Sequence, residues 1–120
     1  NGCGRIINTV SMLGPQARPT VPAYISAKEG LRALTRALAV EVGADGILVN
    51  AIAPGYIATE LNTALLEDQE FSEWVISKTP LARWGQPHEL GGGVVFLMSE
   101  AGSFVNGQVL SIDGGMSIQV

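Results

Sequence analysis

The chain has 120 residues, of which 47% are hydrophobic and 15% are charged, and its formal net charge at pH 7 is -4. This length allows one small domain with a buried core, and the composition is typical of soluble globular proteins. The negative charge and the lack of a basic run argue against a nucleic-acid-binding surface.

No apolar run is long enough to span a bilayer and no signal peptide is visible, so we expect no membrane association. The single cysteine, Cys3, cannot form an internal disulfide, which suits a reducing cytoplasm. His88 is the only histidine and has no cysteine near it, so we expect no metal site.

Taken in chain order, the elements predict an α/β fold with a parallel sheet. Residues 5–10, 47–53 and 109–112 form short apolar runs with β-branched residues, typical of buried strands. Between the first two, a helix is predicted from residue 22 or 23 to residue 42, ended by Gly43 and Gly46. The order strand, helix, strand predicts a βαβ unit, so Ser11 and Pro54-Gly55 should meet at one edge of the sheet.

The long helix carries two stripes of residues. One is apolar, and the other has small side chains that would let another backbone approach closely. We expect the small stripe to pack on a sheet, on the same helix of a second subunit, or on both. The apolar stripe comprises Leu31, Leu34, Leu38 and Val42, and the small stripe comprises Ser26, Gly30, Ala33 and Ala37.

Two further helices are predicted in the second half of the chain. Residues 58–77 show an acidic face opposite an apolar face, which indicates either a lid over the strand ends or an ordinary amphipathic helix. Residues 88–99 form the other helix. It contains Gly91, Gly92 and Gly93, each of which costs about 1 kcal/mol against alanine. This glycine triplet lacks the lysine and the preceding strand of a phosphate-binding loop.

The most informative chemical pair is Tyr24 and Lys28, at the start of the long helix. A spacing of four residues puts both side chains on one helix face, with a rise of about 6 Å between their alpha carbons. A nearby ammonium favours the phenolate, so Tyr24 could exchange a proton near neutral pH, and the Ser11 hydroxyl could hold a substrate oxygen. On spacing alone, an exposed helical pair without chemistry explains the pattern equally well.

Four motifs in order make the chain resemble the short-chain dehydrogenase/reductase family. They are Gly4-Arg5-Ile6-Ile7-Asn8 leading to Ser11, Tyr24-x-x-x-Lys28, Val49-Asn50-Ala51-Ile52-Ala53-Pro54-Gly55, and Asn106-Gly107-Gln108 leading to Asp113-Gly114-Gly115. The resemblance covers all 120 positions but only the C-terminal half of a family member. Residues 54–60 and 79–85 look most like those of gluconate 5-dehydrogenases, followed by 2-deoxy-gluconate 3-dehydrogenases and 3-oxoacyl-carrier-protein reductases.

The resemblance implies an NAD(P)-dependent oxidoreductase that interconverts a secondary alcohol and a ketone, here on a sugar acid such as gluconate. Tyr24 would be the general acid/base, Lys28 would assist it and hold the nicotinamide ribose, and Ser11 would orient the carbonyl. The nicotinamide end of NAD or NADP would contact Pro54, Gly55, Ile57 and Thr59. The resemblance also implies a homo-oligomer, with the long helix at a dimer interface and the C-terminal strand completing a tetramer.

The family's glycine-rich dinucleotide loop is the main feature that the sequence lacks. Gly2-Cys3-Gly4 is a poor substitute because a strand, rather than a helix, follows it. Also absent are the asparagine of the family's catalytic tetrad and the residue that selects NAD or NADP. We therefore expect a three-strand C-terminal half of a Rossmann-like doubly wound sheet, inactive by itself. The alternatives are a non-catalytic subunit-interaction module and a βαβ domain in which the motifs are accidental.

Overall fold

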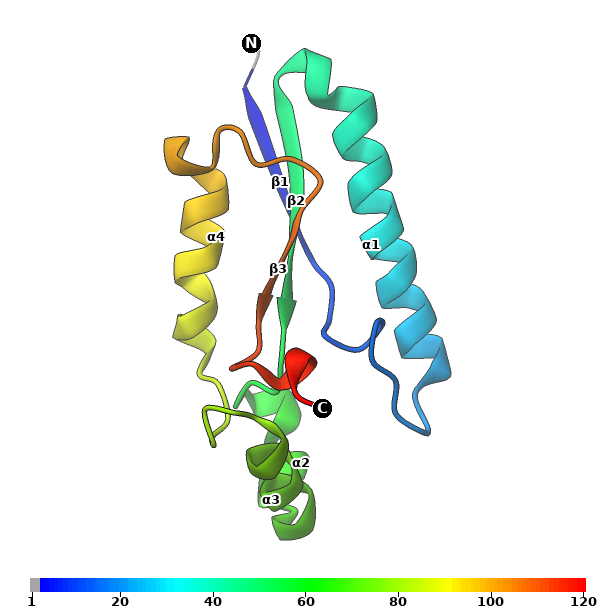
Figure 1. Cartoon of the computed structure of the whole chain (residues 1–120), viewed down its shortest axis with the longest axis vertical. Coiled ribbons are helices and arrows are strands. Elements are labelled where there is room, and N and C mark those ends of the chain that lie inside the picture. Colours follow the sequence, from blue (N-terminus) through cyan, green and yellow to red (C-terminus); the bar gives the residue numbers. More distant parts are fainter. Residues whose placement is uncertain (1–2) are drawn as a thin grey trace.

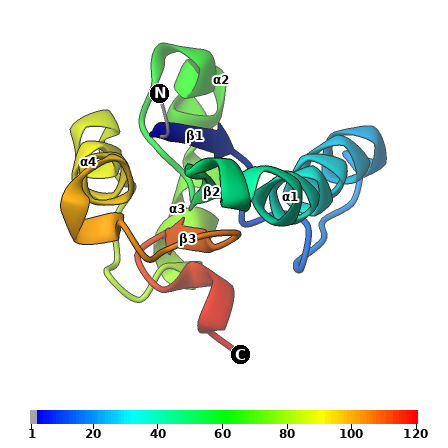
Figure 2. The same ribbon diagram turned by 90° about the horizontal axis from the view of Figure 1, so that it is seen from above.

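The computed structural model describes residues 3–120 as a three-stranded parallel sheet with helices on both faces. The strands are β1 (Gly4–Thr9), β2 (Ile47–Pro54) and β3 (Val109–Ile112), in the spatial order β1-β2-β3. α1 (Pro22–Val42) covers one face and α4 (Gly91–Met98) covers the other (Figure 1, Figure 2). The predicted α/β class and the predicted order strand, helix, strand along the chain are confirmed, and Gly2 lies outside the described residues.

The predicted element boundaries are mostly close to those of the structure. The register pairs Ile6 with Val49 and Ala51 with Val109, so β2 is the central strand and is almost fully buried. The core is built from Val10, Ala51 and Ala53, with Leu31 of α1 and Val109 of β3 packed against it. β1 begins and ends one residue earlier than predicted.

The single helix predicted over residues 58–77 is wrong. The structure has a short 3-10 turn (Glu60–Asn62), then α2 (Thr63–Glu67) and α3 (Gln69–Lys78). The chain breaks at Asp68, whose backbone is extended and whose carboxylate accepts a hydrogen bond from the Phe71 backbone N–H at 3.0 Å. Asp68 therefore acts as an N-cap, a role that aspartate fills better than an interior helix position. α2 and α3 lie beyond the C-terminal ends of the strands (Figure 1).

The prediction for the two stripes of α1 also needs correction. All four small residues of the second stripe are exposed, so they do not pack on the sheet of this chain. Leu34, placed in the apolar stripe, is 48% exposed. The residues of α1 that the sheet buries completely are Thr35 and Ala39. The Thr35 hydroxyl donates to the Leu31 carbonyl at 2.8 Å and accepts from the Asn8 side chain at 3.0 Å, which satisfies it inside the core.

Two asparagines join β2 to the turn that precedes β3. The buried Asn50 side chain donates to the Val105 carbonyl at 2.8 Å and accepts from the Gln108 N–H at 2.9 Å. Asn106 accepts from the Val49 N–H and donates to the Ala39 carbonyl, both at 2.9 Å. These bonds hold β3 against β2. Asn50 and Asn106, which both belong to the sequence motifs, therefore have a structural role as partners of backbone groups.

The helix predicted over residues 88–99 begins as a 3-10 turn (Pro87–Leu90) and continues as α4, so its bounds are close to those predicted. Within the glycine triplet, a Cβ on Gly93 would lie 2.6 Å from Ile112 Cδ1 of β3, whereas Gly91 and Gly92 have nothing within 4 Å. Gly93 is therefore needed for close packing of α4 on the sheet. No helix among residues 3–120 is long and apolar enough to cross a membrane.

Candidate active site

The C-terminal end of β1 is held to α1 by two basic side chains. The Lys28 ammonium donates to the Thr9 carbonyl at 2.8 Å, and the Arg32 guanidinium donates to the Ser11 carbonyl at 2.8 Å. Arg32 is itself paired with Glu29 at 2.7 Å. This arrangement fixes the backbone that carries Ser11 relative to the helix that carries Tyr24.

Tyr24 and Lys28 lie on one face of the first turns of α1, as the spacing predicts. The Lys28 ammonium is 5.7 Å from the centre of the Tyr24 ring, and Tyr24 is 47% exposed. Pro22 occupies the start of the helix, where its missing N–H costs nothing. An ammonium has three donors and Thr9 takes one of them, so Lys28 can donate to further oxygens.

Ser11 is only 6% exposed, and its position is fixed by hydrogen bonds on both sides. Val10 donates to the Ile52 carbonyl at 2.9 Å and Met12 donates to the Pro54 carbonyl at 3.3 Å. The Ser11 hydroxyl oxygen accepts from the Leu13 N–H at 3.1 Å. Because that contact uses a lone pair, the hydroxyl hydrogen can donate to a substrate oxygen.

A cavity of about 310 Å³, here called the Ser–Tyr cavity, brings Ser11 and Tyr24 together. Gly55 at the end of β2 also lines it, and residues around α2 form one wall: Leu61, Asn62 and Leu65. This volume falls within the range of about 300–1,000 Å³ that is typical of small-molecule sites. Leu61 is 92% exposed.

Of the four candidate residues at the end of β2 and in the loop after it, only Gly55 lines the Ser–Tyr cavity. Gly55 donates to the Ile112 carbonyl at 3.0 Å, and a Cβ on Gly55 would lie 2.7 Å from the Asp113 Cβ. Pro54, the last residue of β2, and Thr59, which precedes the 3-10 turn, do not line the Ser–Tyr cavity. Ile57 is buried and lies instead beside a second, smaller cavity.

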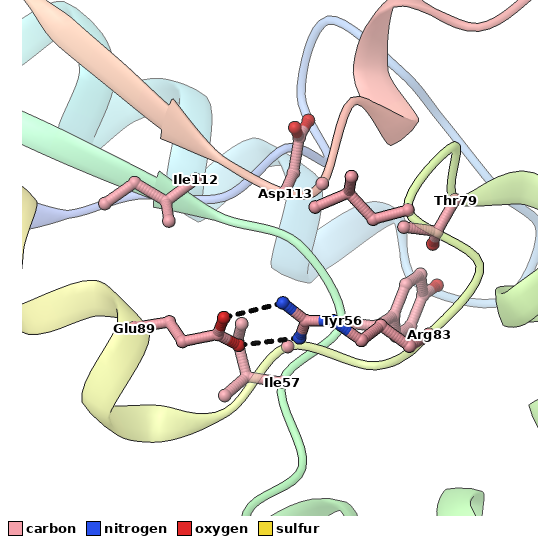
Figure 3. Close-up of a pocket in the computed structure, with 10 residues that line it drawn as sticks. Tyr56, Ile57, Thr79, Arg83, Glu89, Ile112 and Asp113 are labelled. Atoms are coloured by element: carbon pink, nitrogen blue, oxygen red, sulfur yellow. Dashed lines mark hydrogen bonds and ion pairs between the residues drawn. The ribbon is translucent and has the colours of Figure 1, made fainter.

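This smaller cavity, of about 100 Å³, lies between the 56–57 loop, the 79–89 segment and the end of β3 (Figure 3). Arg83 forms a two-pronged ion pair with Glu89 on its rim, at 2.8 and 2.7 Å. The hydrogen bond from Arg83, with a second from the Gln86 backbone, lowers the pKa of Glu89 to about 2. The Ala58 N–H donates to the Gly85 carbonyl at 2.9 Å, which holds the two loops together.

Aromatic side chains form a cluster behind the Ser–Tyr cavity. The Tyr56 ring lies 5.6 Å from both Phe71 and Trp84 and 6.0 Å from Trp74 in edge-to-face geometry. The Trp84 indole donates to the Ser72 hydroxyl at 2.9 Å. Burial raises the pKa of Tyr56, and Tyr24 raises it a little further, while Arg18 acts in the opposite direction.

Sequence reasoning missed three residues at this site. Arg32 could have been found, because it extends the Tyr24 and Lys28 face by one more helical turn of four residues. Arg18 and Tyr56, which both line the Ser–Tyr cavity, had no comparable signal. No group of three or more potential metal-binding side chains lies together in the part of the chain that the structure describes.

Comparisons with known proteins agree on one family. The family model described as enoyl-(acyl carrier protein) reductase matches residues 1–117. The chain is 44% identical to the gluconate 5-dehydrogenase of Gluconobacter oxydans strain 621H, covering 99% of this chain and 46% of the relative. It is 47% identical to the 5-keto-D-gluconate 5-reductase of Escherichia coli strain K12, covering 98% and 46%.

Solved structures give the same result. A gluconate 5-dehydrogenase from Burkholderia cenocepacia J2315, in complex with NADP and tartrate, superposes with a TM-score of 0.96 at 46% identity. The match covers 99% of this chain and 47% of that one, so the chain spans about half the length of the relatives it matches. Together with the parallel sheet and the motifs at its strand ends, these matches show that the chain belongs to the short-chain dehydrogenase/reductase family.

Proposed function

We propose that this chain forms the catalytic half of an NAD(P)-dependent oxidoreductase that interconverts a secondary alcohol and a ketone on a sugar acid such as gluconate. The observation that carries the proposal is one cavity lined by both Ser11 and Tyr24, with Lys28 beside the Tyr24 ring. The relatives named above act on gluconate or 5-keto-D-gluconate, and one of them was solved with NADP and tartrate, a hydroxy acid.

Each of the three residues has a defined role in the proposed reaction. In the reducing direction, Ser11 donates a hydrogen bond to the carbonyl oxygen and Tyr24 gives that oxygen a proton. In the oxidising direction, Tyr24 takes the proton back from the alcohol. The Lys28 ammonium stabilises the phenolate that results from proton donation. When bound, the nicotinamide ring supplies or accepts the hydride at the substrate carbon.

We further propose that NAD or NADP lies with its nicotinamide end at the rim of β1 and β2. Lys28 has donors left for ribose hydroxyls. Pro54 ends β2, and Gly55, Ile57 and Thr59 lie in the loop directly after it, where parallel sheets bind their ligands. The NADP of the Burkholderia cenocepacia structure supports NADP as the first coenzyme to test.

The remaining part of the coenzyme site, on this proposal, comes from a dinucleotide-binding half that precedes the described strands in a longer protein. β1 is an edge strand of the described sheet, and its Ile6 is 42% exposed. We propose that α2 serves as a lid because its neighbours line the cavity, and that the exposed small stripe of α1 forms a dimer interface within a tetramer. We also propose a cytoplasmic location, with which the free, exposed thiol of Cys3 agrees.

A chimera tests the proposed function. The chain is joined to the N-terminal half of the Escherichia coli 5-keto-D-gluconate 5-reductase, and reduced coenzyme is followed with D-gluconate and NADP. We expect turnover of gluconate by the chimera and none by the 120-residue chain alone. A folded chimera that does not oxidise gluconate but reduces a 3-oxoacyl thioester would show that the substrate is an acyl thioester and not a sugar acid. One that turns over neither, yet associates with the whole reductase, would favour an interaction module.

A further inference from the structure

Arg18 is the one cation that lines the Ser–Tyr cavity among the described residues, and no acidic side chain lines that cavity. It lies in the loop between β1 and α1, seven residues after Ser11. Its charge opposes the rise that burial causes in the pKa of Tyr56, and both residues line the Ser–Tyr cavity. Arg18 is therefore the one formally charged side chain that lines this cavity in the described part of the chain.

Arg18 and Tyr56 each have one buried polar atom without a hydrogen-bond partner in the chain. These atoms are the Nε of Arg18 and the hydroxyl oxygen of Tyr56. Buried donors without an acceptor are rare in folded proteins, and the described residues contain one more, the Nε of Arg5. The donors of Arg18 and Tyr56 differ from it in belonging to residues that line the Ser–Tyr cavity, where a ligand or a water can accept from them. Burial keeps Tyr56 protonated at neutral pH, because its pKa lies above the ordinary value of 10. Tyr56 is therefore a neutral donor beside a cationic one.

The guanidinium is also held in place. The Arg18 Cζ lies 5.5 Å from the centre of the Phe71 ring, a distance at which a cation is attracted to the ring face. Phe71 is fixed in turn by the edge of Tyr56 at 5.6 Å. A donor that is already positioned loses little freedom when it binds an anion.

We propose that Arg18 and Tyr56 form the acid-binding end of the Ser–Tyr cavity, where they hold the carboxylate of a hydroxy acid while Ser11 and Tyr24 hold its reacting oxygen. A carboxylate accepts hydrogen bonds from both donors, and a guanidinium matches its planar geometry. This inference rests on the proposed function and adds the residues that select an acid over a neutral polyol.

A binding experiment on the 120-residue chain tests the proposal without turnover. Amide and side-chain NMR shifts are followed during titration with D-gluconate and with D-glucitol, which carries a hydroxymethyl group in place of the carboxylate. We expect gluconate to bind more tightly than glucitol. Arg18→Gln should raise the Kd for gluconate by about tenfold or more and leave the Kd for glucitol unchanged. Tyr56→Phe should weaken gluconate binding by a smaller factor.

Arg36→Gln is the matched control, because Arg36 is an exposed cation of α1 that does not line the cavity. It should leave both affinities unchanged. Arg18→Lys keeps the charge without the planar fork and should bind gluconate with intermediate affinity, which also covers the case in which Arg18→Gln fails to fold.

Several outcomes would overturn the acid-binding role. They are no preference for gluconate in the unsubstituted chain, an equal loss of both ligands in Arg18→Gln, or unchanged gluconate binding in a folded variant. These outcomes are separable from failure of the proposed function. The titration follows binding without turnover, so its result does not depend on whether Tyr24 transfers a proton, and turnover by the chimera does not depend on the titration.

Discussion

At the scale of single residues, the site depends on spacing along one helix face. Tyr24, Lys28 and Arg32 follow one another at intervals of four residues. Lys28 donates to the carbonyl of Thr9, the last residue of β1, and Arg32 donates to the carbonyl of Ser11, two residues further on. The pair Tyr24 and Lys28 could be predicted from sequence because helical spacing alone brings them together. Arg18 could not be predicted, because its place beside Phe71 depends on how an irregular loop meets α3.

Gly55 offers a residue-scale prediction about stability. A Cβ at this position would lie 2.7 Å from the Asp113 Cβ and 2.8 Å from its Cα. We expect Gly55→Ala to lower the free energy of unfolding by about 1–3 kcal/mol, because the backbone of the β3 end must shift. Urea unfolding of the chain measures this change.

Gly92→Ala is the matched control, since Gly92 lies inside α4 and a Cβ added there would have nothing within 4 Å of it. Alanine at this position should raise the free energy of unfolding by about 0.5–1 kcal/mol through helix propensity. Equal urea midpoints for Gly55→Ala and the unsubstituted chain would contradict the proposed close approach.

At the scale of elements, strands and the long helix could be predicted because their signals are local. The apolar runs, Pro22 and the closing glycines set the boundaries of β2, β3 and α1 to within a residue. The break between α2 and α3 at Asp68 was missed because the amphipathic pattern continues across it. The hydrogen bond of the Asp68 N-cap, which starts a new helix there, leaves no mark on that pattern. For the small stripe the sheet alternative was wrong and the second-subunit alternative stays a prediction, because periodicity defines a face without saying what covers it.

The ion pair between Arg83 and Glu89 gives an element-scale prediction about pH, because it joins the 82–86 loop to the turn before α4. The pKa of Glu89 is about 2 in the folded chain, against an ordinary value of 4.5. Its contribution to stability is therefore complete above pH 4.5 and is lost as the pH falls through about 2. The unsubstituted chain should thus lose stability across this interval more steeply than Glu89→Gln.

The measurement is the urea midpoint as a function of pH for both proteins. Glu41→Gln is the control, because Glu41 is exposed at the end of α1, and its curve should parallel that of the unsubstituted chain. Parallel curves for Glu89→Gln and the unsubstituted chain below pH 4.5 would show that this ion pair adds nothing to stability.

At the scale of the whole molecule, the arrangement explains why the chemistry gathers at one end. Both crossovers run between parallel strands, so β1, β2 and β3 all end on the side where α2 and α3 lie (Figure 1). Ser11 and Gly55 reach the Ser–Tyr cavity from these strand ends, and Tyr24 reaches it from the start of α1. The fold class and this shared edge were predictable from element order. For residues 58–77 the sequence left two alternatives, a lid over the strand ends and an ordinary amphipathic helix, because an apolar face does not say what it covers.

The central claim is that Tyr24 transfers the proton, and replacing it with phenylalanine in the gluconate-oxidising chimera tests this most directly. The ring and its packing remain, and only the exchangeable hydroxyl is lost. We predict a fall in kcat of about 10²–10⁴, with coenzyme binding retained. A Tyr24→Phe chimera that oxidises gluconate at the unsubstituted rate would contradict the account.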